Sequence, residues 1–201
     1  MLRLSHKMSS LLTALILAAS LGLTACAPAL VGVGTAAVAA SSTEKGFSTS
    51  VADNVIKTKL SDKFLRADVD LVSGVSSSVN EGSVLLTGIV SDQDKKITAT
   101  KLAWEIKGVR EVVNEIEVSQ QTSLKNRAKD FAAAAQLRLK IIGDGSVSSL
   151  NFSIDVVEGV VYISGIAETQ EERARVIALA QELPFAKKVV DYIILTSDRR
   201  D

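Results

Sequence analysis

One stretch of this chain occurs twice, and the repeat limits the possible folds more than any other feature. "EGSVLLTGIV" begins at Glu81, and "EGVVYISGIA" begins 77 positions later at Glu158. The two copies stay in register, with no gap, as far as Leu195. Self-similarity at a fixed period is typical of repeated structural units. We therefore predict two copies of one small domain instead of a single large one.

Each copy begins its repeated part with the pattern of a β-hairpin. In the second copy, apolar residues alternate with polar or small ones, which is typical of a strand with one buried face; they are Leu150, Phe152, Ile154 and Val156. Glu158 and Gly159 follow, and glycine accepts the positive φ of a tight turn. Gly165 in the returning strand indicates a bulge or the close approach of a helix.

Two helices complete each copy. The helix after the second hairpin, residues 169–183, is predicted by apolar residues that share one face, namely Val176, Leu179, Ala180 and Leu183. The helix before the first hairpin has an apolar stripe made of Val55, Ile56, Leu60 and Phe64. Its counterpart, residues 123–142, is rich in alanine, which favours a helix. On the second helix of the first copy, we interpret Trp104 as a packing residue or as part of the interface between the domains.

These elements predict an α+β fold with the order αββαβ in each copy. Two helices would pack on one face of a small three-stranded mixed sheet and bury its core. We assign residues 48–119 to the first domain and residues 123–197 to the second. Residues 198–201 form a short tail.

The N-terminal segment is typical of a targeting signal. Basic residues without an acid precede an apolar run from Leu11 to Leu23, which matches a secretory signal. The run is too short for a transmembrane helix of about 20 residues. The following "LTAC" resembles the lipobox of bacterial lipoproteins, which implies a signal peptide over residues 1–25 and acyl groups, palmitate among them, on Cys26. An ordinary signal with a chance cysteine, or an uncleaved helix, is the alternative.

The residues after Cys26 bear on where such a lipoprotein would go. In the sorting pattern of these proteins, Ala27 at this place implies the periplasmic leaflet of the outer membrane. Residues 26–47 comprise the lipidated cysteine and a segment of small residues, which we interpret as a flexible tether. A short apolar segment that packs on the membrane or on the protein is the other interpretation.

The composition excludes several kinds of chemistry. His6 and Cys26 are the only histidine and the only cysteine, so the mature chain would have no histidine and no free thiol. This excludes histidine-based acid–base catalysis, Ser-His-Asp and Cys-His nucleophiles, and zinc sites with His or Cys ligands. The net charge of zero gives no general attraction to nucleic acid. We expect no enzyme, no metal, no nucleic-acid partner and no cofactor beyond the lipid on Cys26.

The repeated unit resembles a known family. The order αββαβ, the glycine of the hairpin and the ending "GVREVVNEI" are similar to the BON domain, a bacterial module associated with periplasmic proteins that interact with phospholipid. Two such units behind a lipobox resemble the dual-BON lipoproteins of Gram-negative bacteria. One departure concerns the turn after the second helix, where Gly108-Val109 of the first copy are Phe185-Ala186 in the second. This difference puts an identical turn in doubt.

The resemblance implies phospholipid binding on the first helix of the second unit. That helix has an aromatic residue, Phe131, among cations that suit anionic headgroups. The predicted phospholipid-binding residues are Lys125, Arg127, Lys129, Phe131 and Arg138. The other interpretation is that Phe131 anchors the helix to its sheet and that the cations form a solvated face. The first helix of the first copy is a poorer candidate, because its lysines are offset by Asp53 and Asp62.

We therefore expect a non-catalytic, periplasm-facing outer-membrane lipoprotein. It would bind an anionic phospholipid membrane through its second BON domain and support envelope integrity. The alternative is an adaptor or structural protein that binds an outer-membrane assembly or division protein, with lipid contact incidental. Exposed strands at the sheet edges would allow a partner to pair with them.

Overall fold

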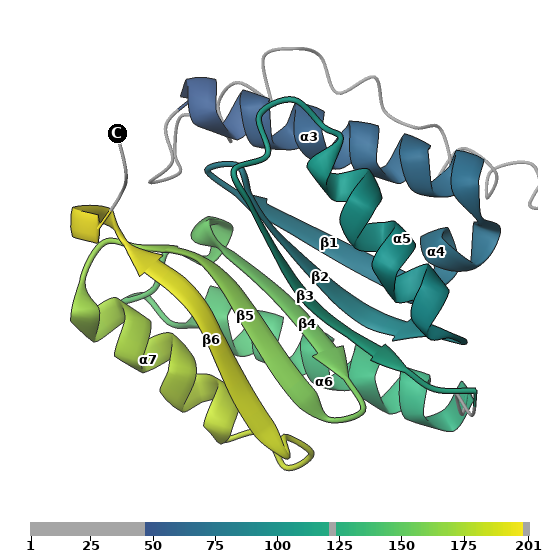
Figure 1. Ribbon diagram of the computed structural model, residues 1–201. Helices are drawn as coiled ribbons and strands as arrows, with labels where there is room; N and C mark the ends of the chain where they lie inside the picture. The colour runs from purple at the N-terminus through teal and green to yellow at the C-terminus, as the bar shows by residue number, and fades with distance from the viewer. Residues whose placement is uncertain (1–46, 121–123, 199–201) are drawn as a thin grey trace, which may run out of the picture. The chain divides into compact units, whose positions relative to one another are not determined.

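The computed structural model describes residues 47–120 and 124–198, which contain two copies of one arrangement (Figure 1). The predicted signal peptide, Cys26 and nearly all of the tether lie outside the described residues. The first copy consists of α3 (Phe47–Ala67), α4 (Val69–Gly74), β1 (Val75–Asn80), β2 (Ser83–Val90), α5 (Gln93–Trp104) and β3 (Glu111–Val118). The second consists of α6 (Leu124–Gly143), η2 (Ser149–Asn151), β4 (Phe152–Val157), β5 (Val160–Ala167), α7 (Gln170–Gln181), β6 (Lys188–Leu195) and η3 (Thr196–Asp198).

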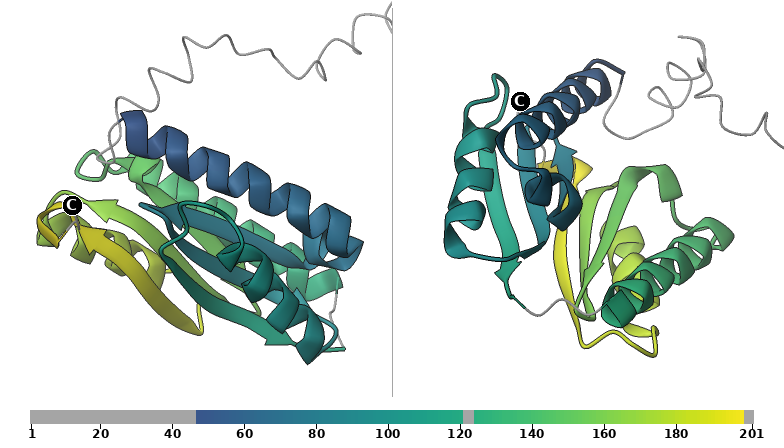
Figure 2. Two further views of the ribbon diagram at one scale, coloured as in Figure 1. Left: turned by 45° about the horizontal axis from the view of Figure 1, so that its top comes forward. Right: turned by 90° about the vertical axis from the view of Figure 1, so that its right-hand side faces the viewer.

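Each copy forms a three-stranded mixed sheet covered by two helices. The sheet orders are β1-β2-β3 and β4-β5-β6, and in each the first pair is antiparallel and the second parallel. Figures 1 and 2 show α3 and α5 on one face of the first sheet, and α6 and α7 on one face of the second. The predicted α+β fold with the order αββαβ is confirmed. The sequence analysis missed the short helical segments α4, η2 and η3.

The hairpin turns depend on two residues with positive φ. Glu81 has a φ of 53° and Gly82 a φ of 77°, and the equivalent Glu158 and Gly159 have φ values of 49° and 83°. Two central residues with positive φ match the tight turns that the right-handed twist of paired strands favours. The glycine was predicted, but the left-handed glutamate was not. A non-glycine residue in this region is strained by about 1 kcal/mol or more.

An aspartate from the preceding helix stabilises each turn. In the first copy, the carboxylate of Asp53 accepts hydrogen bonds from the backbone N–H groups of Glu81 (2.9 Å) and Gly82 (3.0 Å). Asp53 is only 5% exposed. Hydrogen bonds to a charged acceptor are stronger than neutral ones, so they offset the strain of the turn. The same contacts connect helix and hairpin in the second copy.

Gly165 is needed for a close approach of backbone to backbone. Its φ is 153°, and a Cβ at this position would lie 2.1 Å from the carbonyl oxygen of Asn151. Gly88 in the first copy has a φ of 117° and would meet the carbonyl oxygen of Gly74 at the same distance. The predicted close approach of a helix is confirmed, because Asn151 is the last residue of η2 and Gly74 is the last residue of α4. The helical segments involved are these short ones before the strands, not the long helices of each copy.

The cores lie between each sheet and its two helices. Val176, Leu179, Ala180 and Leu183 are all buried, as predicted, and so are Ile56, Leu60 and Phe64. Three packing predictions were wrong. Val55 is 45% exposed because it faces away from the sheet, and Leu150 is 64% exposed because it lies in η2, before the strand begins. Trp104 at the end of α5 is 52% exposed and belongs to neither core.

The opposite faces of the two sheets also carry apolar side chains. Leu85, Val157 and Tyr162 form one buried cluster that draws on both copies. Polar contacts join the copies in the same region: Thr87 donates to Asp155, and the phenol of Tyr192 donates to Glu115. The central strands β2 and β5 are therefore buried on both faces. This explains why their sequences are almost continuously apolar instead of alternating.

Candidate functional site

Helix α6 has one face in the core and an unusual opposite face. Its inward residues are buried, and they are Ala133, Ala134, Leu137 and Ile141. On the solvent side, Phe131 is 78% exposed, Leu139 70% and Ile142 61%. At about 100° per residue, Phe131 and Ile142 lie on one line along the helix and Leu139 lies beside it. The exposed face of α6 is thus an apolar stripe, and Phe131 does not anchor the helix to its sheet.

Cations flank this apolar stripe on both sides. Arg127 and Arg138 follow the line of Phe131 along one border, and Lys125 and Lys129 lie toward the other. All four are exposed, and none forms an ion pair within the described part of the chain. Arg138 also donates one hydrogen bond, to the backbone carbonyl of Ile154 (3.2 Å). All five predicted residues are thus exposed on α6. Arg127 and Arg138 lie close to the line of Phe131, whereas Lys125 and Lys129 lie on the far side of Leu139.

Two further charged residues of α6 have structural roles. Lys140 pairs with Glu182 at 2.8 Å, and Lys63 in the first copy pairs with Glu105 at 2.6 Å. Asp130 accepts the backbone N–H groups of the β4–β5 turn. These contacts explain why both copies carry the same residue types at these places. The charges of Lys140 and Asp130 are therefore engaged within the protein, and we leave both residues out of the ligand-binding face of α6.

The first copy supplies an internal control for the exposed face. Phe131 and Leu139 of α6 correspond, 77 positions earlier, to Asn54 and Asp62 of α3. The flanking cations are also missing from α3, where Ser50, Ala52 and Ser61 stand in place of Arg127, Lys129 and Arg138. Helix α3 does expose Val51, Val55 and Leu65. The fold itself therefore does not require the exposed aromatic and basic residues of α6.

Sequence reasoning missed Leu139 and Ile142. The signal for them was present, because their spacing of 8 and 11 residues from Phe131 places them near its side of a helix. The sequence alone did not show whether this side of the helix faces the sheet or the solvent. Both ends of this alanine-rich helix contain apolar residues, and only the position of the sheet separates core from surface.

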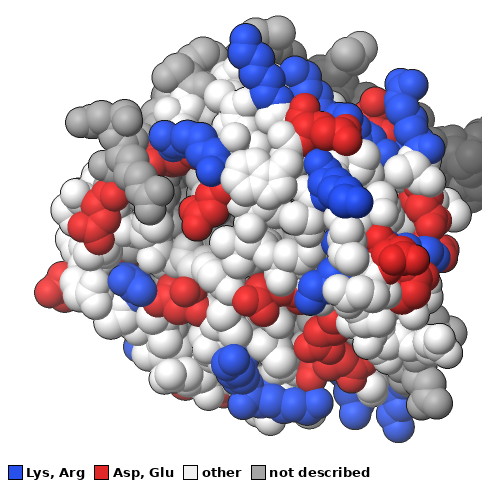
Figure 3. All heavy atoms as spheres, viewed as in Figure 1, with Lys and Arg blue, Asp and Glu red and all other residues white. Residues whose placement is uncertain are grey.

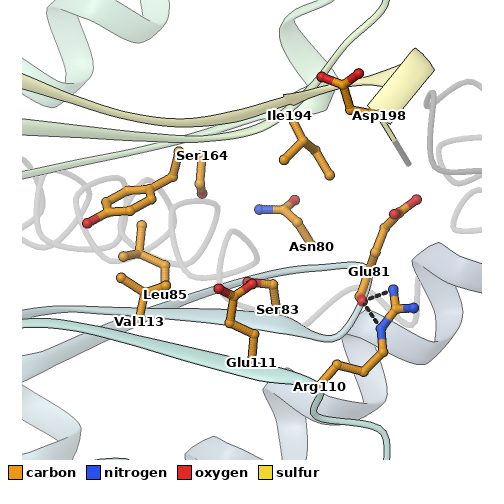
Figure 4. Close-up of a pocket in the computed structure, with 11 residues that line it drawn as sticks. Asn80, Glu81, Ser83, Leu85, Arg110, Glu111, Val113, Ser164, Ile194 and Asp198 are labelled. Carbon is orange, nitrogen blue, oxygen red and sulfur yellow. Dashed lines mark hydrogen bonds between the residues drawn. The ribbon is translucent and has the colours of Figure 1, made fainter. Parts of the chain in front are cut away.

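A cavity of about 280 Å³ is lined by residues from both copies (Figure 4). Arg110 reaches into it, but its guanidinium already donates to the backbone carbonyl of Glu81. Three carboxylates border the cavity, those of Glu81, Glu111 and Asp198. Figure 4 shows them pointing in different directions, and Glu111 accepts a hydrogen bond from the hydroxyl of Ser83 (3.2 Å). They do not form the converging carboxylate pair that hydrolytic acid–base chemistry needs.

Charged side chains of both signs lie on the face of the molecule that Figure 3 draws. Figure 3 shows basic and acidic side chains interspersed over this face, without a large area of one sign.

Within residues 47–120 and 124–198, no cluster of three or more His, Cys, Asp or Glu side chains is placed to hold a metal ion. No helix in the same ranges has the length and apolar character needed to cross a membrane.

The edge strand β3 is a poor surface for pairing with another chain. It lies at one edge of the first sheet and carries Glu111, Glu115 and Glu117. Charged side chains along an edge discourage the addition of a further strand. This observation weakens the adaptor hypothesis in the form that depends on β3.

Comparison with known proteins identifies the repeated unit. The family model "BON domain" matches residues 52–120 and again residues 129–197. The chain is 29% identical over 178 residues to the outer membrane lipoprotein DolP of Haemophilus influenzae, covering 88% of this chain and 92% of that protein. It is 40% identical over 126 residues to an uncharacterized protein in the gshII 5′ region of Anaplasma centrale, covering 62% of this chain and 83% of that protein. It is also 26% identical over 139 residues to the osmotically-inducible protein Y of Escherichia coli, covering 68% of this chain and 69% of that protein. The chain therefore belongs to the BON domain family and carries two BON domains in tandem.

Proposed function

We propose that this chain is a non-catalytic outer-membrane lipoprotein, anchored through Cys26, that binds anionic phospholipid with the exposed face of α6. The observation that carries the proposal is the apolar stripe of Phe131, Leu139 and Ile142 between two borders of cations. A helix with this cross-section suits the membrane interface, where apolar side chains enter the acyl boundary and cations meet the phosphates. Its role would be to support envelope integrity from the periplasmic side.

The expected energies favour such contact. Full burial of a side chain such as Phe or Leu stabilises by about 1.5–3 kcal/mol. Each cation near an anionic surface adds about 1 kcal/mol at low screening. The internal comparison with α3 supports a specific role for α6, because Phe131, Leu139 and the flanking cations have no counterpart of the same kind on α3. Ile142 is the exception, since it corresponds to the exposed Leu65. The similarity to a protein named as an outer membrane lipoprotein supports the anchor and the location.

The test uses residues 27–201, which lack the signal and the acylated cysteine. Every core residue of the described chain lies at or after Ile56, so this segment keeps both cores. Binding to phosphatidylglycerol vesicles is compared with binding to phosphatidylcholine vesicles by co-sedimentation. The double variant Phe131→Asn and Leu139→Asp places the residues of α3 on α6. We expect it to fold normally and to lose more than roughly ten-fold in partition to the anionic vesicles.

Charge reversal separates the proposal from the adaptor alternative. Changing Lys125, Arg127 and Lys129 to glutamate should abolish the preference for anionic vesicles, because three attractive charges become repulsive. Equal binding to both lipids by the parent chain, or unchanged binding by the reversed variant, would refute lipid recognition by α6. The membrane would then be contacted by the anchor alone, and a protein partner would take precedence.

A further inference from the structure

The loop between α7 and β6 exposes an aromatic side chain that the fold does not use. Phe185 is 59% exposed, although Leu183 before it is buried and Ala186 after it packs against the core. In the first copy the same place is Gly108, with a φ of 102°. The turn hydrogen bonds are nevertheless equivalent, from Val109 to Ile106 and from Ala186 to Leu183, each 3.1 Å. The turn therefore forms without an aromatic residue.

Phe185 lies beside cations from two elements. A hollow of about 150 Å³ is lined by Phe185 and Lys187 of the loop and by Lys129 of α6. Neither lysine forms an ion pair within the described residues. The hollow also has two acids, and both have partners. Asp130 accepts two backbone N–H groups of the β4–β5 turn, and Glu158 accepts a hydrogen bond from Asn126 (3.0 Å).

We propose that the Phe185 loop is a second point of contact with the anionic lipid surface that α6 binds. Phe185 enters the interface, and Lys129 and Lys187 meet the phosphates on either side of it. The inference rests on the proposed function, because Lys129 belongs both to this hollow and to the border of the α6 stripe. An aromatic ring next to cations suits the boundary between acyl chains and headgroups.

A second contact has a mechanical consequence. A single helix lying on a membrane is free to roll about its own axis, so the domain above it has no fixed tilt. Figure 1 shows the α7–β6 loop at one end of the second domain. This loop belongs to the same domain as α6 but lies far from it in sequence. Contact at both places fixes the orientation of the second BON domain on the bilayer.

The experiment again exchanges residues between the two copies in residues 27–201. Phe185→Gly introduces the residue of the first copy, and Trp104→Gln introduces Gln181 of the second copy at another exposed aromatic. We expect Phe185→Gly to lower partition to phosphatidylglycerol vesicles by roughly ten-fold, as loss of one partly inserted aromatic side chain implies. Trp104→Gln should bind like the parent chain. Urea unfolding checks that both variants fold, and Phe185→Ser replaces Phe185→Gly if the latter does not.

A fluorescence readout tests the position of the loop directly. The chain has one tryptophan, so the double variant Trp104→Gln and Phe185→Trp carries its only indole in the loop. Phosphatidylglycerol vesicles should shift its emission to the blue, and phosphatidylcholine vesicles should not. No shift, together with normal partition of Phe185→Gly, would overturn the second contact while leaving the α6 proposal intact. Normal partition of the Phe131→Asn, Leu139→Asp variant would instead refute the proposed function itself, and with it this inference.

Discussion

The carboxylate of Asp130 accepts hydrogen bonds from the backbone N–H groups of Glu158 (2.8 Å) and Gly159 (2.9 Å). Helix α6 is thereby connected to the hairpin turn 28 residues away, where a glutamate has a positive φ. Removing the acceptor would leave two turn N–H groups without their partner. It would also release the strained turn from the helix.

Asp130→Ala should therefore destabilise the protein by about 2–4 kcal/mol, since each lost charged hydrogen bond costs about 1–3 kcal/mol. The free energy of unfolding in urea measures the effect. Asp62→Ala is the matched control, because the ion pair of Asp62 within the described residues is with the exposed Arg66 of the same helix. Exposed pairs of this kind contribute well under about 1 kcal/mol. Equal losses for both variants would contradict the structural role of Asp130.

Gly165→Ala should be among the most damaging single substitutions in the second domain. The new Cβ would lie 2.1 Å from the carbonyl oxygen of Asn151, at a φ of 153° that side chains disfavour. Backbone must move to relieve the clash, and we expect a loss of about 3 kcal/mol or more in urea unfolding. Gly143→Ala is the control, because a Cβ there meets nothing within 4 Å. A small effect at Gly165 would show that the strand entry adjusts freely.

The phenols of both tyrosines should lose their protons only at unusually high pH. Burial, followed by the nearby charge of Glu115, raises the pKa of Tyr162 from 10.0 to about 12. Burial and the hydrogen bond to Glu115 raise the pKa of Tyr192 as well. These are the only tyrosines, so tyrosinate absorbance reports on both directly. The native chain should titrate clearly above pH 10, and the urea-unfolded chain near it.

The raised pKa of Tyr162 makes the folded protein less stable at high pH. Folding favours the neutral phenol of Tyr162, so its contribution is complete below pH 10 and is lost as the pH rises toward 12. The contacts between the two sheets should then weaken first, because both phenols belong to that cluster. If the tyrosinate titration of the native chain had the same midpoint as that of the unfolded chain, the burial of the two phenols would be contradicted.

Asp144 should give the opposite pH dependence. The hydroxyl of Ser146, then the guanidinium of Arg175, lower the pKa of Asp144 from 3.8 to about 2. A lowered pKa means stability that is present above pH 4 and is lost as the pH falls toward 2. NMR titration of the Asp144 carboxyl carbon measures the pKa. In the Arg175→Gln variant, the pKa should move back toward 3.8 but stay below it, because Ser146 remains.

Much of the architecture was predictable because it depends on local sequence. The 77-residue repeat, the strand alternation and the helical spacing of Val176, Leu179 and Ala180 are properties of neighbouring residues. They predict which segments form helices and strands, and the repeat predicts that the arrangement occurs twice. The cations of α6 were visible for the same reason, since charge on a helix can be counted before its neighbours are known.

Tertiary structure decided which of these residues reach solvent and which groups meet across the chain. The sequence contains Asp130 and Gly159, but only the docking of α6 on its sheet brings the carboxylate to the turn. The burial of β2 and β5 on both faces required the second sheet, which no local pattern supplies. The exposure of Leu139 and of Phe185 likewise depends on where the sheet lies, because periodicity gives a residue's face but not what covers that face.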